Sequence, residues 1–454
     1  MDQRLAVSDQ RSAERRSQEH HFHFPTFALS LVGVGILIAL LIWPALHYRG
    51  DRLAFASLYV VQLAFYGFAC WLVWRSQAPC KHGLRIILIF ALVFRIALLA
   101  TDPHLSDDIY RYVWDGKVQA AGINPYRYIP ADERLAHLRD SEIFPYINRK
   151  DYATTIYPPA AQMIFLGAYS LFGSSVQGMK LTLIGFDLLT IAVLVVILRQ
   201  LPIDPNRMIA YAWHPLAVWE FAHSGHLDAA ALTFIVLALL FRLRKRLVPT
   251  GIFLGLATLV KFYPILLLPA FYKRWDWKLP AALLTTVALA YLPYLSVGWG
   301  VFGYLLGYAR EERFSNGQRF FLLEVARFLA PVPTWVYVAI AAVILGIVAW
   351  KVLNRTPGVN QYVAGGLLLA GTAMLLGTPH YPWYFLWLLP FLCLRLSAAW
   401  FCLVSAAVLL YFVVDRSKSE IVYDCFQYIP VYGLLIWQRL FKTRSDSKET
   451  ISTP

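Results

Sequence analysis

Long apolar runs, repeated along the whole sequence, restrict more than any other feature what this chain can fold into. Each run of about 17–25 residues is long enough to cross a bilayer as a helix. Only 15% of the residues are charged, compared with about a quarter in an ordinary soluble domain. Because backbone polar groups in lipid must be satisfied within the chain, these runs are expected to be helical. The sequence therefore predicts an all-α polytopic membrane protein, with the lipid bilayer as a partner.

The net charge of +14 could suggest a nucleic-acid partner, but the positions of the charges argue against one. Lys and Arg lie in short clusters between apolar runs, as at residues 242–246 and 273–278, which is typical of cytoplasmic loops. We expect a multi-pass protein of the cytoplasmic (inner) membrane with both termini in the cytoplasm. Residues 26–441 would form the transmembrane domain, residues 1–25 a disordered cytoplasmic tail and residues 442–454 a second cytoplasmic tail.

About fourteen apolar stretches can be counted, which predicts roughly 12–14 transmembrane helices. The third stretch is expected to carry the chain outward, since the loop before it is basic. Basic anchors further along do not fit a simple alternation of spans. Either residues 156–172 re-enter without crossing, or another stretch is broken. Residues 251–272 are a candidate for a broken pair, because Lys261 and Pro264 interrupt them.

A long hydrophilic segment follows the third stretch, at residues 101–155, and is expected to face outward. Its nine acidic and seven basic residues give a net charge of −2. Asp107 and Asp108 begin a short helical pattern that stops at Gly122 and is apolar on one side, which is typical of a helix lying along the membrane surface. A second outward loop is expected at about residues 298–330.

The two aspartates have two possible roles. They could simply cap the helix and interact favourably with its dipole. Their place at the water–lipid boundary favours a catalytic role, because a transferase needs a carboxylate there. Such a general base takes a proton from a sugar hydroxyl while that oxygen attacks the anomeric carbon of a lipid-carried donor, which gives inversion.

Other ionisable residues lie at membrane depth, where burying a charge costs free energy. They are therefore expected to serve a function. Lys261 is either a snorkelling lysine or a phosphate partner at a helix break. His380 lies between two prolines in an aromatic segment and could bond a phosphate or a hydroxyl. His226 and Asp228 form either a metal site or a turn that binds sugar or phosphate, and we favour the turn. The five cysteines have no paired or metal-ligand spacing. No cofactor and no bound metal are predicted, although a divalent cation stays an open alternative.

Several segments resemble bacterial polyprenyl-phosphate-mannose-dependent mannosyltransferases of the GT-C superfamily, near the glycosyltransferase 87 group. The resemblance covers roughly residues 84–390. It is carried by SDDIYRYVWDG at 106–116, GINPY at 122–126, IYPP at 156–159, GHLD at 225–228, LVKFYP at 259–264 and PHYPWY at 379–384. The chain differs from many members of the superfamily in having three apolar stretches before the acidic loop instead of one. Helix numbering therefore cannot be transferred.

The resemblance implies a GT-C-type helical bundle, an outward active site and a polyprenyl-phosphate-linked sugar as donor. The expected activity is transfer of a hexose, here mannose, to a glycolipid or glycan acceptor. It implies that Asp107 or Asp108 is catalytic, without choosing between them. Arg111, Lys261 and His380 match positions that hold the donor phosphate, while Tyr110, His226 and Asp228 are expected to bind sugar. The alternatives are a transporter or flippase of lipid-linked glycans and a polymerase or ligase of whole lipid-linked oligosaccharides.

Overall fold

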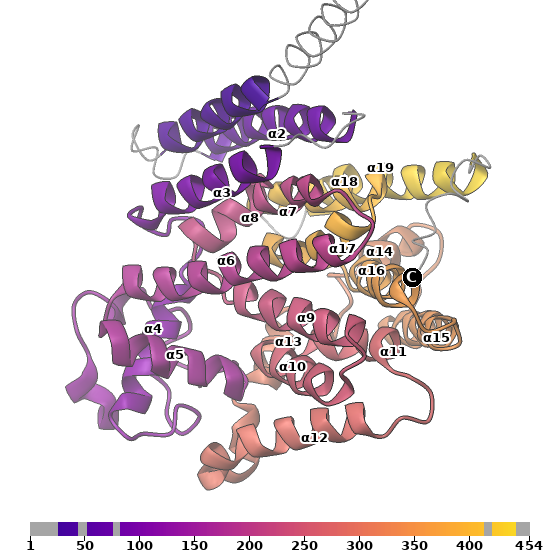
Figure 1. The fold of residues 1–454 in the computed structure, drawn as a ribbon. Coiled ribbons are helices and arrows are strands. Elements are labelled where there is room, and N and C mark those ends of the chain that lie inside the picture. Colours follow the sequence, from indigo (N-terminus) through magenta and orange to yellow (C-terminus); the bar gives the residue numbers. More distant parts are fainter. Residues whose placement is uncertain (1–25, 44–51, 76–81, 413–419, 442–454) are drawn as a thin grey trace, which may run out of the picture.

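The computed structural model describes residues 26–43, 52–75, 82–412 and 420–441. The two predicted tails, residues 1–25 and 442–454, lie outside the described residues. Within the described ranges every regular element is a helix, so the predicted all-α class is confirmed (Figure 1). This follows from the apolar composition, since a lipid-facing backbone can satisfy its own polar groups in a helix.

Six helical segments among the described residues are long and apolar enough to cross a membrane, or seven if one sharply bent pair counts as a span. The six are Thr26–Trp43, Ala54–Arg75, Val176–Gln200, Lys278–Glu311, Thr334–Leu353 and Val359–Gly377. Four more apolar helices have 10–17 residues: Pro159–Phe172, Leu247–Val260, Pro382–Leu394 and Ala398–Phe412. The apolar stretches of the sequence are thus divided between full-length spans and short or broken helices, which is why their number exceeds that of full-length spans.

The first part of the chain forms one side of the bundle and then leaves it as the acidic loop (Figure 1). Besides the helix Thr26–Trp43, this part contains α2 (Arg52–Arg75), α3 (Gly83–Leu99), α4 (Asp108–Ala120), η1 (Glu133–Leu138), η2 (Phe144–Tyr146), α5 (Pro159–Phe172) and α6 (Val176–Gln200). A buried ion pair of 2.5 Å between Arg95 of α3 and Asp187 of α6 ties the helix before the loop to a long helix after it.

α5 is the element that corresponds to the ambiguous stretch at residues 156–172. Its 14 residues span about 21 Å at 1.5 Å per residue, which is less than the roughly 30 Å of a hydrocarbon core. It packs against α4 along its length. The loop helix α4 is therefore held by protein contacts, and its apolar residues Ile109, Val113 and Trp114 are buried.

A bent pair of helices forms the centre of the molecule. The segment Pro215–His223 meets Asp228–Leu243 at 119°, and its last turn is π-helical. Gly225 makes the bend possible because its φ of +69° favours glycine, and a Cβ there would lie 2.5 Å from Ile109 Cδ1. The elements here are η3 (Pro205–Met208), α7 (Ile209–Ala212), α8 (Pro215–Val218), η4 (Trp219–His223) and α9 (Asp228–Leu243).

A second break interrupts the stretch at residues 251–272, as predicted. α10 (Leu247–Val260) ends where Lys261 takes an extended conformation, and Pro264 lies in the short helix that follows. The remaining elements are η5 (Tyr263–Leu267), α11 (Leu268–Phe271), α12 (Lys278–Tyr291), η6 (Leu292–Phe302), α13 (Leu305–Glu311), α14 (Phe321–Arg327), α15 (Thr334–Leu353), α16 (Val359–Gly377), η7 (Pro382–Leu388), α17 (Leu389–Leu394), α18 (Ala398–Ala406), η8 (Ala407–Phe412) and α19 (Glu420–Leu440).

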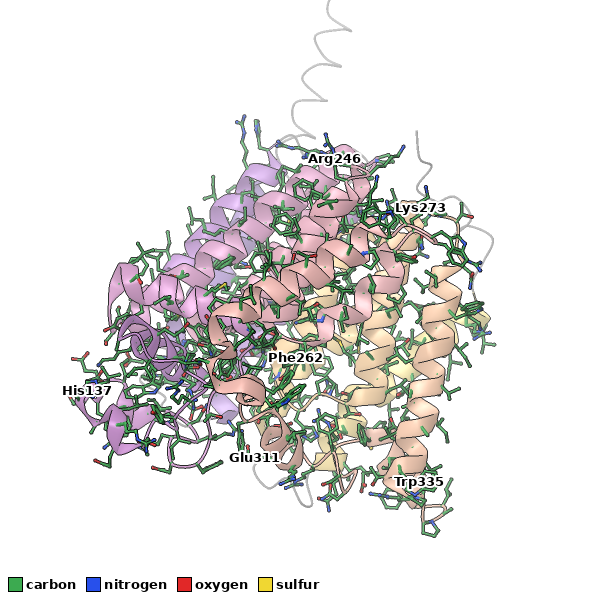
Figure 2. The ribbon with its side chains drawn as sticks, turned by 90° about the horizontal axis from the view of Figure 1, so that it is seen from below. His137, Arg246, Phe262, Lys273, Glu311 and Trp335 are labelled. Atoms are coloured by element: carbon green, nitrogen blue, oxygen red, sulfur yellow. The ribbon has the colours of Figure 1, made fainter. Side chains whose placement is uncertain are left out.

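The two ends of the bundle differ in composition. Figure 2 shows Arg246 and Lys273 at one end, His137, Glu311 and Trp335 at the other, and Phe262 between them. Arg246 and Lys273 belong to the basic loops, whereas His137 belongs to the acidic loop. The break after α10 therefore lies inside the bundle, and the two loops at residues 101–155 and 298–330 share one end.

Candidate active site

A cavity of about 920 Å³ opens where the acidic loop, the break after α10, α13 and the segment 380–384 meet. Its polar lining brings together five of the residues predicted from the sequence: Asp107, Asp108, Arg111, Lys261 and His380. They come from distant parts of the chain, and the two helix interruptions allow them to meet. A break in a helix within the membrane is tolerated where the freed backbone groups line a cavity.

The two carboxylates lie at the start of α4, where the helix dipole favours negative charge. Asp107 occupies the N-cap position, but its side chain makes no capping hydrogen bond. The Asp108 backbone N–H instead donates to Ser106 Oγ at 3.3 Å. Both carboxylates accept from Asn148, whose Nδ2 lies 2.9 Å from Asp107 Oδ1 and 2.8 Å from Asp108 Oδ1. This arrangement leaves the Asp107 side chain without a capping role.

The surroundings of Asp107 alter its ionisation. Burial among the cavity residues raises the pKa of Asp107 above its ordinary value, and the nearby Asp108 carboxylate raises it further. The hydrogen bond from Asn148 and the charge of Arg149 act in the opposite direction. A carboxyl with a raised pKa is a stronger base once it is ionised.

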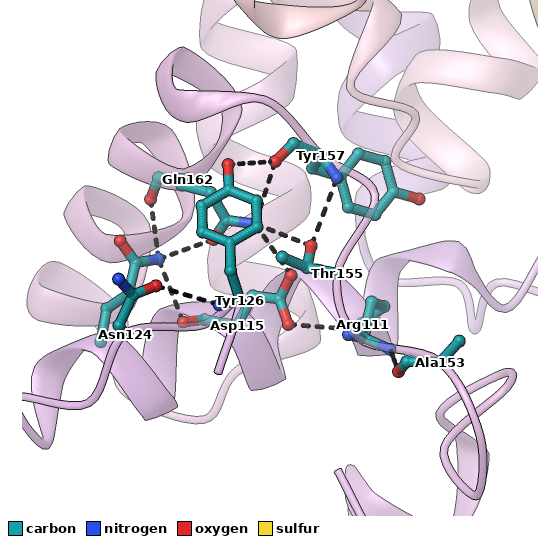
Figure 3. Close-up of polar contacts among 9 residues, drawn as sticks. Arg111, Asp115, Asn124, Tyr126, Ala153, Thr155, Tyr157 and Gln162 are labelled. Atoms are coloured by element: carbon teal, nitrogen blue, oxygen red, sulfur yellow. Dashed lines mark hydrogen bonds and ion pairs between the residues drawn. The ribbon is translucent and has the colours of Figure 1, made fainter. Parts of the chain in front are cut away.

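Arg111 lines the cavity but is already held by its neighbours. Its Nε donates to Asp115 Oδ1 at 2.8 Å and its Nη1 to the Ala153 carbonyl oxygen at 3.2 Å. Gln162 of α5 donates to the other Asp115 oxygen at 3.0 Å and to Thr155 Oγ1 at 2.8 Å. Figure 3 shows how this network joins α4, α5 and the end of the acidic loop. Arg111 therefore presents its charge to the cavity from a fixed position.

Lys261 lies opposite, at the break after α10. Its Nζ forms a 2.5 Å ion pair with Asp228, and it lies over the ring of Tyr384 at 4.7 Å. Asp228 is fully buried and also accepts from Tyr263 Oη at 2.8 Å and from Trp387 Nε1 at 3.2 Å. Asp228 thus fixes the lysine from behind, and a snorkelling role for Lys261 does not fit this enclosure.

His380 is buried at the edge of the cavity, next to a second ion pair. Its Nδ1 lies 3.6 Å from Glu312 Oε2, and the same carboxylate oxygen lies 3.4 Å from Arg319 Nη1. Glu312 and Arg319 belong to the second loop predicted to face outward. His380 therefore sits where the acidic cavity meets this loop.

Three predicted sugar ligands lie away from the cavity lining. Tyr110 packs against Tyr146, with ring centroids 5.0 Å apart. His226 is fully buried and stacks at 3.8 Å on Trp383, which does line the cavity, while Asp228 holds Lys261. Direct sugar contact by these three residues stays a prediction.

The second loop also forms part of the wall, which the sequence did not predict. Tyr308 of α13 lines the cavity, and Glu311 at the end of α13 forms a 2.5 Å ion pair with Arg149. Asn148 was missed as well. It lies in a loop without periodic pattern, and about forty residues separate it from the aspartates, so no local signal marks it.

A second, largely apolar cavity of about 530 Å³ adjoins the first. The two share lining residues, among them Tyr263, Tyr308 and Tyr384, and the second extends between α15 and α16. α15 is the least buried of the candidate spans, with 11% of its apolar stretch buried inside the protein. The polar cavity is thus continuous with an apolar space beside the helices that face lipid.

The comparison with known families gives the class of protein. The family model described as alpha-(1->6)-mannopyranosyltransferase, N-terminal domain, matches residues 21–276, more than half of the chain. The chain belongs to this family. No curated protein and no solved structure matches it.

Membership of the alpha-(1->6)-mannopyranosyltransferase family confirms the resemblance to GT-C mannosyltransferases and supports glycosyltransferase activity. The matched region contains Asp107, Asp108, Arg111 and Lys261. His380 and the second loop lie beyond it, and their place in the site rests on the geometry of the cavity.

Proposed function

We propose that the protein is an inverting mannosyltransferase that uses polyprenyl-phosphate mannose. The acceptor is a glycolipid or glycan on the outer face of the cytoplasmic membrane. An acceptor hydroxyl oxygen attacks the anomeric carbon of the donor, the bond from that carbon to the phosphate oxygen breaks, and polyprenyl phosphate leaves. Asp107 or Asp108 takes the hydroxyl proton as the general base.

One observation carries this proposal: two carboxylates and three groups able to bind phosphate line one cavity. Asp107 and Asp108 lie next to each other in the lining, which also contains Arg111, Lys261 and His380. Negative charge develops on the leaving phosphate as the bond breaks, and fixed donors or cations stabilise it. The ion pairs of Arg111 and Lys261 hold both cations in place before the donor arrives.

The adjoining apolar cavity supports a lipid-linked donor. A polyprenyl phosphate has a charged group joined directly to a long apolar chain, and it needs a polar site next to an apolar one. The two cavities meet at Tyr263, Tyr308 and Tyr384 and provide this arrangement.

The family description also bears on stereochemistry. If the product is an alpha-(1->6) mannoside, as the family's description states, inversion requires a donor whose phosphate is β-linked. The attacking group would be a primary hydroxyl, which is ordinarily un-ionised and therefore needs a base.

The test is transfer of labelled mannose by the purified protein in lipid. Polyprenyl-phosphate [14C]mannose is supplied with an extract of glycolipid acceptors, and the wild type is compared with Asp107→Asn and Asp108→Asn. We expect the wild type to transfer label and one of the two variants to lose activity by about a hundredfold or more. Each variant keeps the size of the side chain and removes the base.

Asp151→Asn is the matched control, because Asp151 is an exposed carboxylate of the same loop outside the cavity lining. It should transfer at the wild-type rate. Full activity in both Asp107→Asn and Asp108→Asn would rule out the proposed base. No transfer by the wild type would rule out the proposed donor.

A further inference from the structure

We infer that Asn148 is the positioning residue of the catalytic carboxylates, holding Asp107 and Asp108 in one orientation through its two amide protons. This inference rests on the proposed function, because it concerns the same general base. Asn148 lines the cavity beside both carboxylates and would act through them.

The geometry is that of a bridge. One nitrogen, Asn148 Nδ2, donates to an oxygen of each carboxylate at 2.9 and 2.8 Å. An amide nitrogen has two protons, so both are used. Two neighbouring carboxylates repel each other, and a shared donor between them lowers the cost of keeping both ionised.

The chain next to Asn148 is held from two sides. The next residue, Arg149, has a φ of +54°, and its carbonyl oxygen accepts from the Ala153 backbone N–H at 3.0 Å, which closes a turn. The Arg149 side chain pairs with Glu311 of the second loop at 2.5 Å. Asn148 therefore sits in a turn tied to both outward loops, and its amide has a fixed direction toward the aspartates.

Loss of the bridge should change the pH dependence of transfer. The charged and titratable groups around Asp107 are Asp108 and Arg111 on α4, Arg149 beside Asn148, and Lys261 and His380 from other parts of the cavity lining. Donation from Asn148 favours the ionised carboxylate. Without it the pKa of the base rises, so activity is lost at a higher pH as the solution is acidified.

The decisive variant is Asn148→Asp, which keeps the shape of the side chain, removes both donors and adds a third negative charge. In the pH profile of kcat/KM, we expect the acid limb to move to higher pH by about one unit or more. Asn148→Ala should move it in the same direction by a smaller amount. A defect of folding alone would lower activity equally at every pH, and thermal unfolding of each variant measures that part separately.

Asn124→Asp is the matched control. Asn124 lies in the same loop and also donates twice through Nδ2, to the Tyr294 carbonyl oxygen at 2.9 Å and to Ser296 Oγ at 3.0 Å. Neither acceptor is a carboxylate, and Asn124 is not part of the cavity lining. Its acid limb should match that of the wild type.

The outcomes separate the two proposals. An unchanged acid limb in Asn148→Asp and Asn148→Ala, in a wild type that transfers mannose and loses activity on replacement of an aspartate, overturns the role of Asn148 alone. A wild type that transfers no mannose overturns the proposed function, and this inference with it.

Discussion

At the scale of single residues, the Lys261–Asp228 ion pair is the most consequential contact behind the cavity. Asp228→Asn leaves Lys261, whose side chain is 11% exposed, without a counter-charge. Breaking a buried pair in this way costs about 3–5 kcal/mol. We expect a clear fall in the temperature of thermal unfolding in lipid or detergent, together with weaker binding of the donor.

The double variant Asp228→Asn with Lys261→Met isolates the charge effect, because it removes both ions. It should be more stable than Asp228→Asn alone while transfer stays impaired. Glu133→Gln supplies an exposed comparison: Glu133 pairs with Arg139 at 3.3 Å, its side chain is 87% exposed, and its loss should leave the unfolding temperature unchanged. If the double variant is no more stable than Asp228→Asn, the unpaired charge of Lys261 is not what destabilises the single variant.

Some residues of the cavity could be predicted from the sequence, and others could not. Asp107, Asp108, Lys261 and His380 could be predicted because charge at the edge of an apolar run is costly and therefore conspicuous. Asn148 and Tyr308 could not, because an amide or a tyrosine in a hydrophilic loop costs nothing until the fold brings it to the cavity. Asp228 was predicted as a site residue, but its ion pair with Lys261 was not. That pair forms because the fold brings the start of α9 next to the break after α10.

At the scale of elements, the contact between α4 and α5 sets the position of the carboxylates. Gly116 of α4 faces α5 so closely that an added Cβ would overlap the Phe165 carbonyl oxygen and lie 2.9 Å from Tyr169 Cβ. Gly116→Ala therefore forces the helices apart, at a cost of about 1–3 kcal/mol. We expect a lower unfolding temperature and, because α4 carries both aspartates, a lower rate of mannose transfer.

Gly167→Ala is the control for this helix pair. Gly167 belongs to α5, and a Cβ there would meet nothing within 4 Å. Alanine favours a helix over glycine by up to about 1 kcal/mol, so this variant should be as stable as the wild type or slightly more stable. Equal destabilisation by both substitutions would contradict the close approach at Gly116.

The two helix breaks differ in how much of their structure could be predicted from the sequence. The break at residues 261–264 was predictable, since a lysine and a proline interrupt an apolar run. A turn at His226 and Asp228 was also predicted, but the 119° angle and the π-helical turn before α9 were not, because a π-helical turn leaves no distinct periodicity in the sequence. A fully buried stretch, such as Ala210 to Ala212, is enclosed on every side. Its sequence therefore has no polar face that would indicate how the helix is oriented.

At the scale of the whole molecule, the bundle has a basic end and an end that carries the cavity loops. Arg246 and Lys273 lie at the first, and His137 and Glu311 at the second (Figure 2). Basic loops are retained in the cytoplasm. The proposed outward active site requires that the two ends face opposite sides of the membrane, and this requirement is independent of any measurement of mannose transfer.

Accessibility of single cysteines tests this orientation. In a background with the native cysteines replaced, His137→Cys and Arg246→Cys each place a thiol at an exposed position at one end of the bundle. A membrane-impermeant maleimide added to intact cells should label the cysteine at 137 and not the one at 246, since only the former would face outward. Inverted vesicles should give the opposite pattern, and Lys273→Cys should behave like Arg246→Cys. Labelling of 246 in intact cells with protection of 137 would put the cavity on the cytoplasmic side, where an acceptor outside the membrane could not reach Asp107 and Asp108.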